Sequence, residues 1–473
     1  MFVTFILILL SGYPIALVLL GVAALFTLVG FLSDLYLGTT TGVSFSYVGL
    51  VVNRIYKLMD NWVLIAIPMF IFMGLMLDRS GIAEKMMDSM QNLFGSVRGG
   101  LAVTIALIGV VLAASTGIIG ASVVLLGLLA IPTMLKQGYD KPFAVGTVAA
   151  SGTLGILIPP SIMLVIMADQ LGLSVGDLFM GAVFPGLILG TMYIGYILVF
   201  SFLKPDKAPL PENRPSLSLK VVWDVLKSAL PAILLILAVL GSIFAGVTTV
   251  TEASGVGALG ALILAAANRR LIHPIRRVQL RFGRRNPSIP LPNFTVLKEV
   301  VRGTFNVTGY IFGIFIGATC FALVLRGLGG DEFIEAALTA IPFGSYGVIF
   351  VILAAVFLLG FFLDWIEITL IVLPLLSPVV ADLTIAVPDY GVIDQPMLIW
   401  FLVLVAVALQ TSFLTPPVGF AIFYLRGVVP KEVELVHIYK GVIPFIILQL
   451  IGLAIIVIWP QLVLWLPSVA YGN

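Results

Sequence analysis

Seven stretches of this sequence are long and apolar enough to cross a lipid bilayer as helices. A spanning helix needs about 20 mostly apolar residues, and the stretches that meet this requirement are 2–30 (broken at Ser11–Pro14), 61–78, 181–203, 229–248, 250–268, 304–325 and 442–466. Because 60% of the residues are hydrophobic and only 10% are charged, the chain lacks the polar side chains that cover a soluble globule. The sequence therefore predicts an all-α polytopic membrane protein, with the lipid bilayer as its surroundings.

The charged and metal-binding residues exclude several classes of function. The net charge is only +2, and the basic residues form no stripe that could neutralise successive phosphates, so no nucleic-acid partner is expected. The single cysteine, Cys320, excludes an intramolecular disulfide and a thiolate cluster, and two histidines, His273 and His437, are too few for a His-rich metal site. We expect no organic cofactor.

Four further apolar stretches are interrupted by Gly, Ser, Thr, Pro or acidic residues, and they are 101–135, 142–168, 345–378 and 396–424. Irregular backbone at membrane depth is tolerated only where it is buried in protein or lines a cavity. The four interruptions together therefore indicate a transport site.

The distribution of charge orients the chain. Residues 269–302 hold nine Lys or Arg residues and one acid, so they are predicted to be a cytoplasmic loop with an irregular linker at Asn286–Pro292, and 204–227 is net basic as well. The stretches 169–180 and 379–395 contain five Asp and no Lys or Arg, which predicts loops on the outer side. The predicted sides of these loops match the number of membrane crossings between them only if 101–135 and 345–378 are re-entrant hairpins. The first would open to the cytoplasm and the second outward.

An internal repeat supports the same topology. The sequence Gly-Ile-Leu-Ile-Pro-Pro-Ser at 155–161 recurs in form as Ser-Phe-Leu-Thr-Pro-Pro-Val at 412–418. An amphipathic stretch, expected to lie in the membrane interface, precedes each hairpin, at 82–97 and 331–341. Each half thus contains a span, a surface helix, a hairpin, a Pro-Pro-broken span and a span, and opposite hairpin openings relate the halves by inversion, as in secondary transporters.

The predicted organisation has five parts. They are an N-terminal membrane segment and connector (1–60), the first inverted repeat (61–203), a linker with two spans and the basic loop (204–303), the second inverted repeat (304–466) and a C-terminal tail (467–473).

The proline pairs suggest an ion site. Proline has no N–H, so the carbonyl four residues earlier loses its helical partner. Such carbonyls and nearby hydroxyls are hard oxygen ligands that suit Na⁺, although the same small residues also suit close helix packing. Their matched occurrence beside both proline pairs favours Na⁺ as a coupling ion. The expected ligands are Ser115, Gly117, Ser151, Gly155, Ile156, Asp364, Thr411, Ser412, Phe413 and Thr415.

Asp364 and Glu367 are the only acids deep in an apolar segment of the second half. Ionisable residues within a membrane are costly to bury and usually functional. Their three-residue spacing predicts one helical face, where they would ligate a cation, carry protons or lie at a wet hairpin mouth. With helix N-termini after the breaks available to a carboxylate, the expected substrate-binding residues are Ser115, Thr116, Ser161, Asp364, Glu367 and Thr415.

Several motifs resemble a known family. They are the run from Ser115-Thr-Gly to Gly138-Tyr-Asp140, the run Ala-Ser-Gly-Thr-Leu-Gly-Ile-Leu-Ile-Pro-Pro-Ser at 150–161, and Thr-Pro-Pro-Val-Gly at 415–419. Over essentially the whole chain, the sequence resembles the large membrane subunit of TRAP transporters, the tripartite ATP-independent periplasmic systems of the dicarboxylate-transporter M type. The resemblance implies a Na⁺-coupled, elevator-type importer of organic anions, usually carboxylates, in the bacterial inner membrane.

The resemblance also implies partners and a substrate branch. The partners are a periplasmic substrate-binding protein and a small four-helix membrane subunit, expected as a separate chain. The first hairpin reads Ser-Thr-Gly-Ile-Ile-Gly-Ala-Ser at 115–122 rather than the Ser-Gly-Ser-Gly of sialic-acid-type members, which with Asp364 and Glu367 disfavours sialic acid. The sequence is more similar to the branch named for mannitol and chloroaromatic compounds.

Two other functions fit parts of the sequence. A self-sufficient Na⁺/dicarboxylate symporter or Na⁺/H⁺ exchanger would share the same physical features, and uptake without a binding protein would distinguish it. An intramembrane protease is disfavoured because Tyr139-Asp140 lies in a loop between Lys136 and Lys141, and both histidines flank basic loops. We therefore expect a transporter and not an enzyme.

Overall fold

The computed structural model describes residues 1–95, 97–116, 119–210, 218–281, 294–388 and 390–471. All regular elements in these ranges are helices. The first half contains α1 (Phe2–Leu9), α2 (Ile15–Tyr36), α3 (Phe45–Val48), α4 (Leu50–Met59), α5 (Ala66–Arg79), α6 (Ile82–Phe94), α7 (Gly100–Thr116), α8 (Ile119–Lys136), α9 (Lys141–Thr153), α10 (Ile162–Gln170) and α11 (Val175–Leu203). The second half contains α12 (Leu219–Phe244), α13 (Val250–Arg281), α14 (Phe294–Gly327), α15 (Gly330–Thr339), α16 (Gly344–Leu359), α17 (Trp365–Glu367), α18 (Leu373–Ala381), α19 (Pro396–Leu414), α20 (Phe420–Arg426), α21 (Leu435–Ile458) and α22 (Gln461–Tyr471).

The lengths of these helices confirm the predicted fold class. Among the described residues, nine helices are long and apolar enough to cross a membrane. The predicted span 442–466 is wrong in its extent, because α21 ends at Ile458 and a separate helix, α22, begins at Gln461. Pro460 lies between them and has no N–H with which to continue α21.

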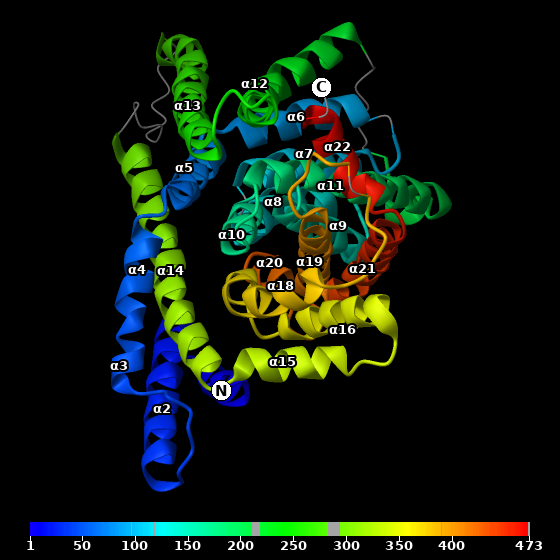
Figure 1. Cartoon of the computed structure of the whole chain (residues 1–473). Helices are drawn as coiled ribbons and strands as arrows, with labels where there is room; N and C mark the ends of the chain where they lie inside the picture. Colours follow the sequence, from blue (N-terminus) through cyan, green and yellow to red (C-terminus); the bar gives the residue numbers. More distant parts are fainter. Residues whose placement is uncertain (96, 117–118, 211–217, 282–293, 389, 472–473) are drawn as a thin grey trace.

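The helices form two groups, which Figure 1 shows side by side. We call α2, α5, α13 and α14 the scaffold group, in which α5 contacts α13 and α14, and α14 contacts α2. The hairpin group comprises α7–α11 and α16–α22. In Figure 1, α6 lies along the upper side of the hairpin group and α15 along its lower side, and each leads from a scaffold helix to the hairpin group.

The order of elements is the same in the two halves. The series α5, α6, α7–α8, α9–α10, α11 is repeated as α14, α15, α16–α18, α19–α20, α21. The helical hairpins and the breaks at both proline pairs, which the sequence predicts, are confirmed. The peptide bonds Pro159–Pro160 and Pro416–Pro417 are both cis.

The surface helices differ in burial. In α6, Ile82, Met86 and Met90 are buried, as their helical spacing predicts, whereas α15 buries only Leu338 and leaves Phe333 exposed. An exposed apolar side chain on such a helix is available to lipid.

The predicted acidic loop 169–180 is too long. Helix α10 continues to Gln170 and α11 begins at Val175, so the connection is only 171–174. The Ser174 hydroxyl accepts a hydrogen bond from the Asp177 N–H at 3.2 Å, and Asp177 is buried in the first turn of α11. The cap starts the helix earlier than the apolar run indicates.

The predicted basic loops are also shorter than expected. Helix α13 continues to Arg281, α14 begins at Phe294, and α12 begins at Leu219 inside the predicted loop 204–227. Lys and Arg are good helix formers, so a loss of hydropathy does not end these helices. The predicted linker at Asn286–Pro292 lies outside the described residues.

The centre of the hairpin group is α19, which carries the second break. Of its spanning window, 94% is buried, against 33% for α11, so protein surrounds it on all sides. The break that follows α19 is covered only in part, because Pro417 and Val418 are exposed. Irregular backbone in a membrane is tolerated where it is buried in protein or lines a cavity.

Close helix crossings hold this group together, and the tightest joins α9 to α21. A Cβ on Gly146 would overlap the carbonyl of Gly441 and lie 2.9 Å from its Cα. We expect Gly146→Val to destabilise the protein by about 3 kcal/mol, because extra atoms in a packed core force the backbones apart. Gly195→Val on α11, where no atom lies within 4 Å of the new Cβ, is the control. Equal melting temperatures for the two variants in detergent would contradict the prediction.

Candidate functional site

The first break lies between α9 and α10. Helix α9 ends at Thr153, a 3-10 turn covers Leu154–Ile156, and α10 begins at Ile162. The Ser161 hydroxyl donates to the Ile156 carbonyl at 2.6 Å. The prediction that this carbonyl is free is therefore wrong, because the serine after the two prolines replaces the missing N–H donor; the oxygen keeps a second lone pair.

The second break follows α19 in a similar way. The Thr415 N–H donates to the Ser412 carbonyl at 3.0 Å, so this carbonyl is not free either. The chain turns tightly at Thr415, and its N–H reaches back three residues. The carbonyls of Phe413 and Thr415 both lie 3.0 Å from where a Cβ of Gly419 would stand. Only a glycine, here at φ +42°, allows this approach and leaves two carbonyl oxygens on one side of the loop.

The hydroxyls of the breaks differ in their partners. Those of Ser151, Thr411 and Thr415 donate to the carbonyl four residues earlier in their own helices, at 2.7 to 2.8 Å. The Ser412 hydroxyl is fully buried and has no hydrogen-bond partner among the described residues. An unpaired buried hydroxyl is costly, so this oxygen is a candidate to bind a further group.

The Ser412 hydroxyl faces the second hairpin. A Cβ on Gly360, at the end of α16, would overlap the Ser412 Oγ, and its distance to the Ser412 Cβ would be 2.9 Å. The glycine lets the first arm of this hairpin reach the broken helix. Because of this close approach, Ser412 lies between the second break and the segment that leads to Asp364.

The first hairpin packs closely on the first break. A Cβ on Gly109 of α7 would lie 2.7 Å from the Ser151 Cβ, and one on Gly152 of α9 would lie 3.0 Å from the Val123 Cα of α8. Helix α9 is thus held between the two arms of the hairpin. At the hairpin tip, Gly117 and the side chains of Ser115 and Thr116 lie outside the described residues. Gly155, in the 3-10 turn, is buried.

Asp364 and Glu367 lie at the tip of the second hairpin. The Asp364 carboxylate accepts the N–H of Trp365 at 2.8 Å and caps α17. Glu367 follows in the first turn of this helix, and the two carboxyl groups lie within electrostatic range of each other. Glu367 is fully buried, no side chain among the described residues donates a hydrogen bond to its carboxylate, and its nearest polar neighbours are the backbone N–H groups of Asp364 and Glu367. A buried carboxyl without a partner is strongly unfavourable unless it binds a proton or a cation.

Two tyrosines that the sequence did not single out lie near these acids. Tyr310 of α14 is within electrostatic range of both carboxyl groups, and Tyr424 of α20 is within range of Asp364. The Tyr424 ring also covers Gly120 of α8, whose Cβ would lie 3.1 Å from it. Tyrosines in apolar segments are common, so only their position in the fold distinguishes them.

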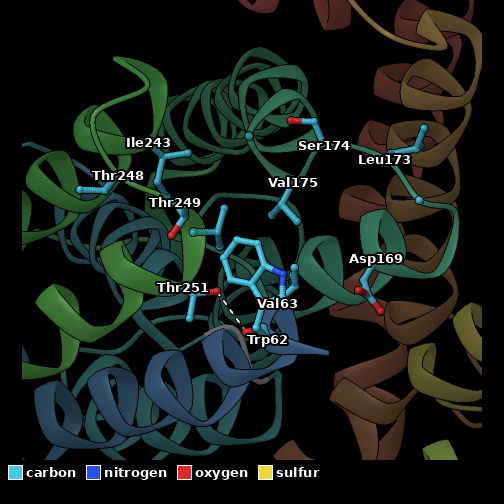
Figure 2. Close-up of a pocket in the computed structure, with 13 residues that line it drawn as sticks. Trp62, Val63, Asp169, Leu173, Ser174, Val175, Ile243, Thr248, Thr249 and Thr251 are labelled. Carbon is cyan, nitrogen blue, oxygen red and sulfur yellow. Dashed lines mark hydrogen bonds between the residues drawn. The ribbon is translucent and has the colours of Figure 1, made fainter. Parts of the chain in front are cut away.

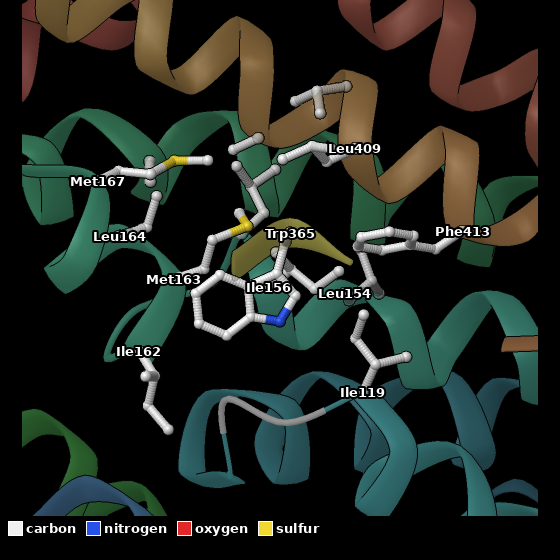
Figure 3. Packing of buried hydrophobic residues seen from close by; sticks show 14 of the residues in the cluster. Ile119, Leu154, Ile156, Ile162, Met163, Leu164, Met167, Trp365, Leu409 and Phe413 are labelled. Carbon is white, nitrogen blue, oxygen red and sulfur yellow. The ribbon is translucent and has the colours of Figure 1, made fainter. Parts of the chain in front are cut away.

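Each broken helix contacts the hairpin of the other half. Helix α10, after the first break, contacts α17 and α18, and α20, after the second break, contacts α8. Figure 3 shows Trp365 of the second hairpin between Met163 and Ile156 of the first break, with Phe413 close by. The two breaks and the tip of the second hairpin therefore lie where both halves meet.

A separate cavity lies between the scaffold and hairpin groups. It has a volume of about 420 Å³ and is lined by Trp62, Asp169, Ser174 and the turn that precedes α13 (Figure 2). The Asn61 amide donates to Asp169 at 2.6 Å, and the Thr251 hydroxyl donates to the Trp62 carbonyl at 3.2 Å. No predicted site residue lines this cavity.

Comparisons with known proteins agree with this architecture. The family described as "Tripartite ATP-independent periplasmic transporter, DctM component" matches residues 2–462. The chain belongs to this family. Its members are permease components of the inner membrane and not enzymes, and large permease proteins of TRAP transporters function with a substrate-binding protein and a small subunit.

Relatives within the family act on different substrates. The chain is 29% identical over 416 residues to the C4-dicarboxylate TRAP transporter large permease protein DctM of Vibrio cholerae serotype O1, covering 87% of each chain. It is 26% identical over 462 residues to the sialic acid TRAP transporter large permease protein SiaM of the same organism, covering 98% of this chain and 96% of SiaM. Membership of the TRAP family therefore leaves the substrate open.

A solved structure has the same fold. The YdaH transporter of Alcanivorax borkumensis superposes with a TM-score of 0.59 at 13% identity, over 97% of this chain and 98% of YdaH. At this identity the likeness concerns the fold alone. It supports the assignment of this TRAP component as a multi-pass membrane protein.

Proposed function

We propose that this chain is the large permease subunit of a Na⁺-coupled secondary transporter that imports an organic anion, a carboxylate, delivered by a periplasmic binding protein. The small four-helix membrane subunit is a separate chain. The observation that carries the proposal is the Ser412 hydroxyl, which is buried without a partner between the second break and the second hairpin.

The donor set fits Na⁺. Hydroxyl and carbonyl oxygens surround the breaks, and no group of three or more His, Cys, Asp or Glu that could hold a metal ion occurs in the described ranges. Bound Na⁺ would supply positive charge beside the substrate. The residues proposed to hold it are Ser115, Gly117, Ser151, Gly155, Ile156, Asp364, Thr411, Ser412, Phe413 and Thr415.

The hydrogen bonds of the breaks constrain how the substrate binds. The Ser161 hydroxyl donates its hydrogen to the Ile156 carbonyl, and the Thr415 hydroxyl donates its hydrogen to the Thr411 carbonyl. Toward a ligand, both hydroxyl oxygens therefore act as acceptors. The substrate carboxylate would instead meet backbone N–H groups in the first turn of α10, where a helix start favours negative charge. Asp364 and Glu367 would accept hydrogen bonds from hydroxyl groups of the substrate, and Ser115 and Thr116 complete the proposed binding residues.

We propose an elevator-type movement for transport. The hairpin group carries both breaks, and α6 and α15 connect it to the scaffold group on opposite sides of the hairpin group in Figure 1. Rigid-body sliding of the hairpin group along the scaffold group would move the site while the breaks keep their contacts.

The test is uptake into proteoliposomes that contain this chain and the small subunit, with the binding protein and radiolabelled carboxylates outside. An inward Na⁺ gradient should drive accumulation, and omission of the gradient or of the binding protein should abolish it. Accumulation without a Na⁺ gradient would contradict the coupling. Na⁺-driven accumulation without the binding protein would instead support a self-sufficient symporter.

A further inference from the structure

A cavity of about 560 Å³ lies where the surface helix α6 meets α12 and α13. It is separate from both breaks and contains none of the proposed transport residues. Its polar lining includes Lys85 and Asp88 of α6, Asp224 and Lys227 of α12, and Asn268 of α13, and its apolar lining includes Pro231 and Leu264. The cavity therefore joins charged and apolar walls.

The charges of this cavity are balanced and largely unpaired. Each of the two helices contributes one lysine and one aspartate three residues apart, a spacing that places them on one helical face. Asp88, Asp224 and Lys227 form no ion pair with any described residue. Lys85 donates to the Asn268 amide oxygen, and the Asn268 amide nitrogen donates to the Ser80 carbonyl at 2.6 Å, which fixes the lysine at the cavity wall.

The position of the cavity indicates a lipid. Helix α6 is predicted to lie in the membrane interface, and α13 leads into the basic segment predicted to be cytoplasmic. Beside the charged residues on the same turns, α12 exposes apolar side chains that do not line the cavity, including Trp223, Leu226 and Leu230. A molecule with a charged head and an apolar tail would meet both surfaces at once.

We propose that this cavity binds the headgroup of a zwitterionic phospholipid with a primary ammonium group, of the phosphatidylethanolamine class. Lys85 and Lys227 would bind its phosphate, and Asp88 and Asp224 its ammonium. Because the four charges sum to zero, an anionic lipid gains no net attraction here. A trimethylammonium headgroup has no N–H to donate to the two carboxylates.

The test measures lipid retention. The purified chain is exchanged into an equimolar mixture of phosphatidylethanolamine, phosphatidylcholine and phosphatidylglycerol, and retained lipids are counted by native mass spectrometry. We expect phosphatidylethanolamine to dominate. Lys227→Gln should lower its retention about fivefold and Lys85→Gln/Lys227→Gln more than tenfold, while Asp88→Asn/Asp224→Asn should remove the preference over the other two lipids.

The controls distinguish the loss of charge in the cavity from a loss of folding, and lipid binding from the binding of other molecules in the cavity. Glu84→Gln on α6 and Lys220→Gln on α12 alter exposed charges that do not line the cavity, and they should retain wild-type lipid. Free phosphoethanolamine should bind far more weakly than the lipid, because it cannot use the apolar wall. Equal retention of the three lipids by the wild type, or unchanged preference in folded double variants, would overturn the proposal. If the lysine and aspartate variants of the cavity retained lipid normally but no longer bound the small subunit, the cavity would be a binding site for that subunit, and the lipid proposal would be wrong.

Discussion

Replacement of Pro416 and Pro417 by alanine should lower Na⁺-dependent uptake roughly tenfold or more. Alanine restores two N–H groups, which can donate to the carbonyls of Ser412 and Phe413 and continue α19 as a helix. The break would close and the arrangement of oxygens around Gly419 would be lost. Uptake by reconstituted complexes, normalised to protein inserted in the vesicles, measures the effect.

A second variant separates the ion site from the shape of the break. Ser412→Ala removes only the unpaired hydroxyl, so we expect weaker Na⁺ activation, with a severalfold higher half-saturating Na⁺ concentration, and normal insertion. The control is Thr191→Val, because the Thr191 hydroxyl donates within its own exposed helix surface at 2.7 Å. An unchanged Na⁺ dependence in both the proline and serine variants would show that the coupling ion binds elsewhere.

Glu367→Leu should stabilise the protein and at the same time reduce uptake roughly tenfold or more. Glu367 is fully buried and no side chain among the described residues pairs with its carboxylate, which costs free energy that a leucine of similar volume does not incur. A melting temperature about 2 °C or more above that of the wild type would show this increase in stability. Residues retained at a cost in stability usually serve function.

The matched control for this variant is Glu332→Leu on the exposed surface of α15. This variant makes the same chemical change outside the site, so it should alter neither the melting temperature nor the uptake strongly. If Glu367→Leu lowered the melting temperature and left uptake intact, the carboxyl group would have a structural role, and it would not belong to the binding site.

Much of the fold could be predicted because its determinants are local. Apolar length predicts the spans, and two consecutive prolines predict both breaks, whereas single prolines such as Pro185 and Pro231 lie inside continuous helices. The partners of the carbonyls could not be predicted in this way. Ser161 and Thr415 donate to Ile156 and Ser412 because of the path that the backbone takes after each proline pair, and hydropathy contains no information on that path.

Other parts of the site depend on contacts between distant segments. Tyr310 approaches the second hairpin through packing of the scaffold group against the hairpin group, and Tyr424 does so through contacts within the hairpin group. No local pattern therefore identifies them. The predicted start of α12 and the predicted end of α13 were wrong for a different reason. Helical hydrogen bonding continues past the apolar run when the following residues are good helix formers.

The crossed contacts between α10 and the second hairpin, and between α20 and the first, have an evolutionary consequence. A half-length ancestor would lack the hairpin that contacts the second segment of its broken helix. It would complete each site only by pairing with a second copy inserted in the opposite direction, as an antiparallel homodimer. Gene duplication and fusion would then have joined two subunits that were already interdependent, and later divergence could assign different chemistry to each copy, such as the Asp364–Glu367 pair that lies only in the second.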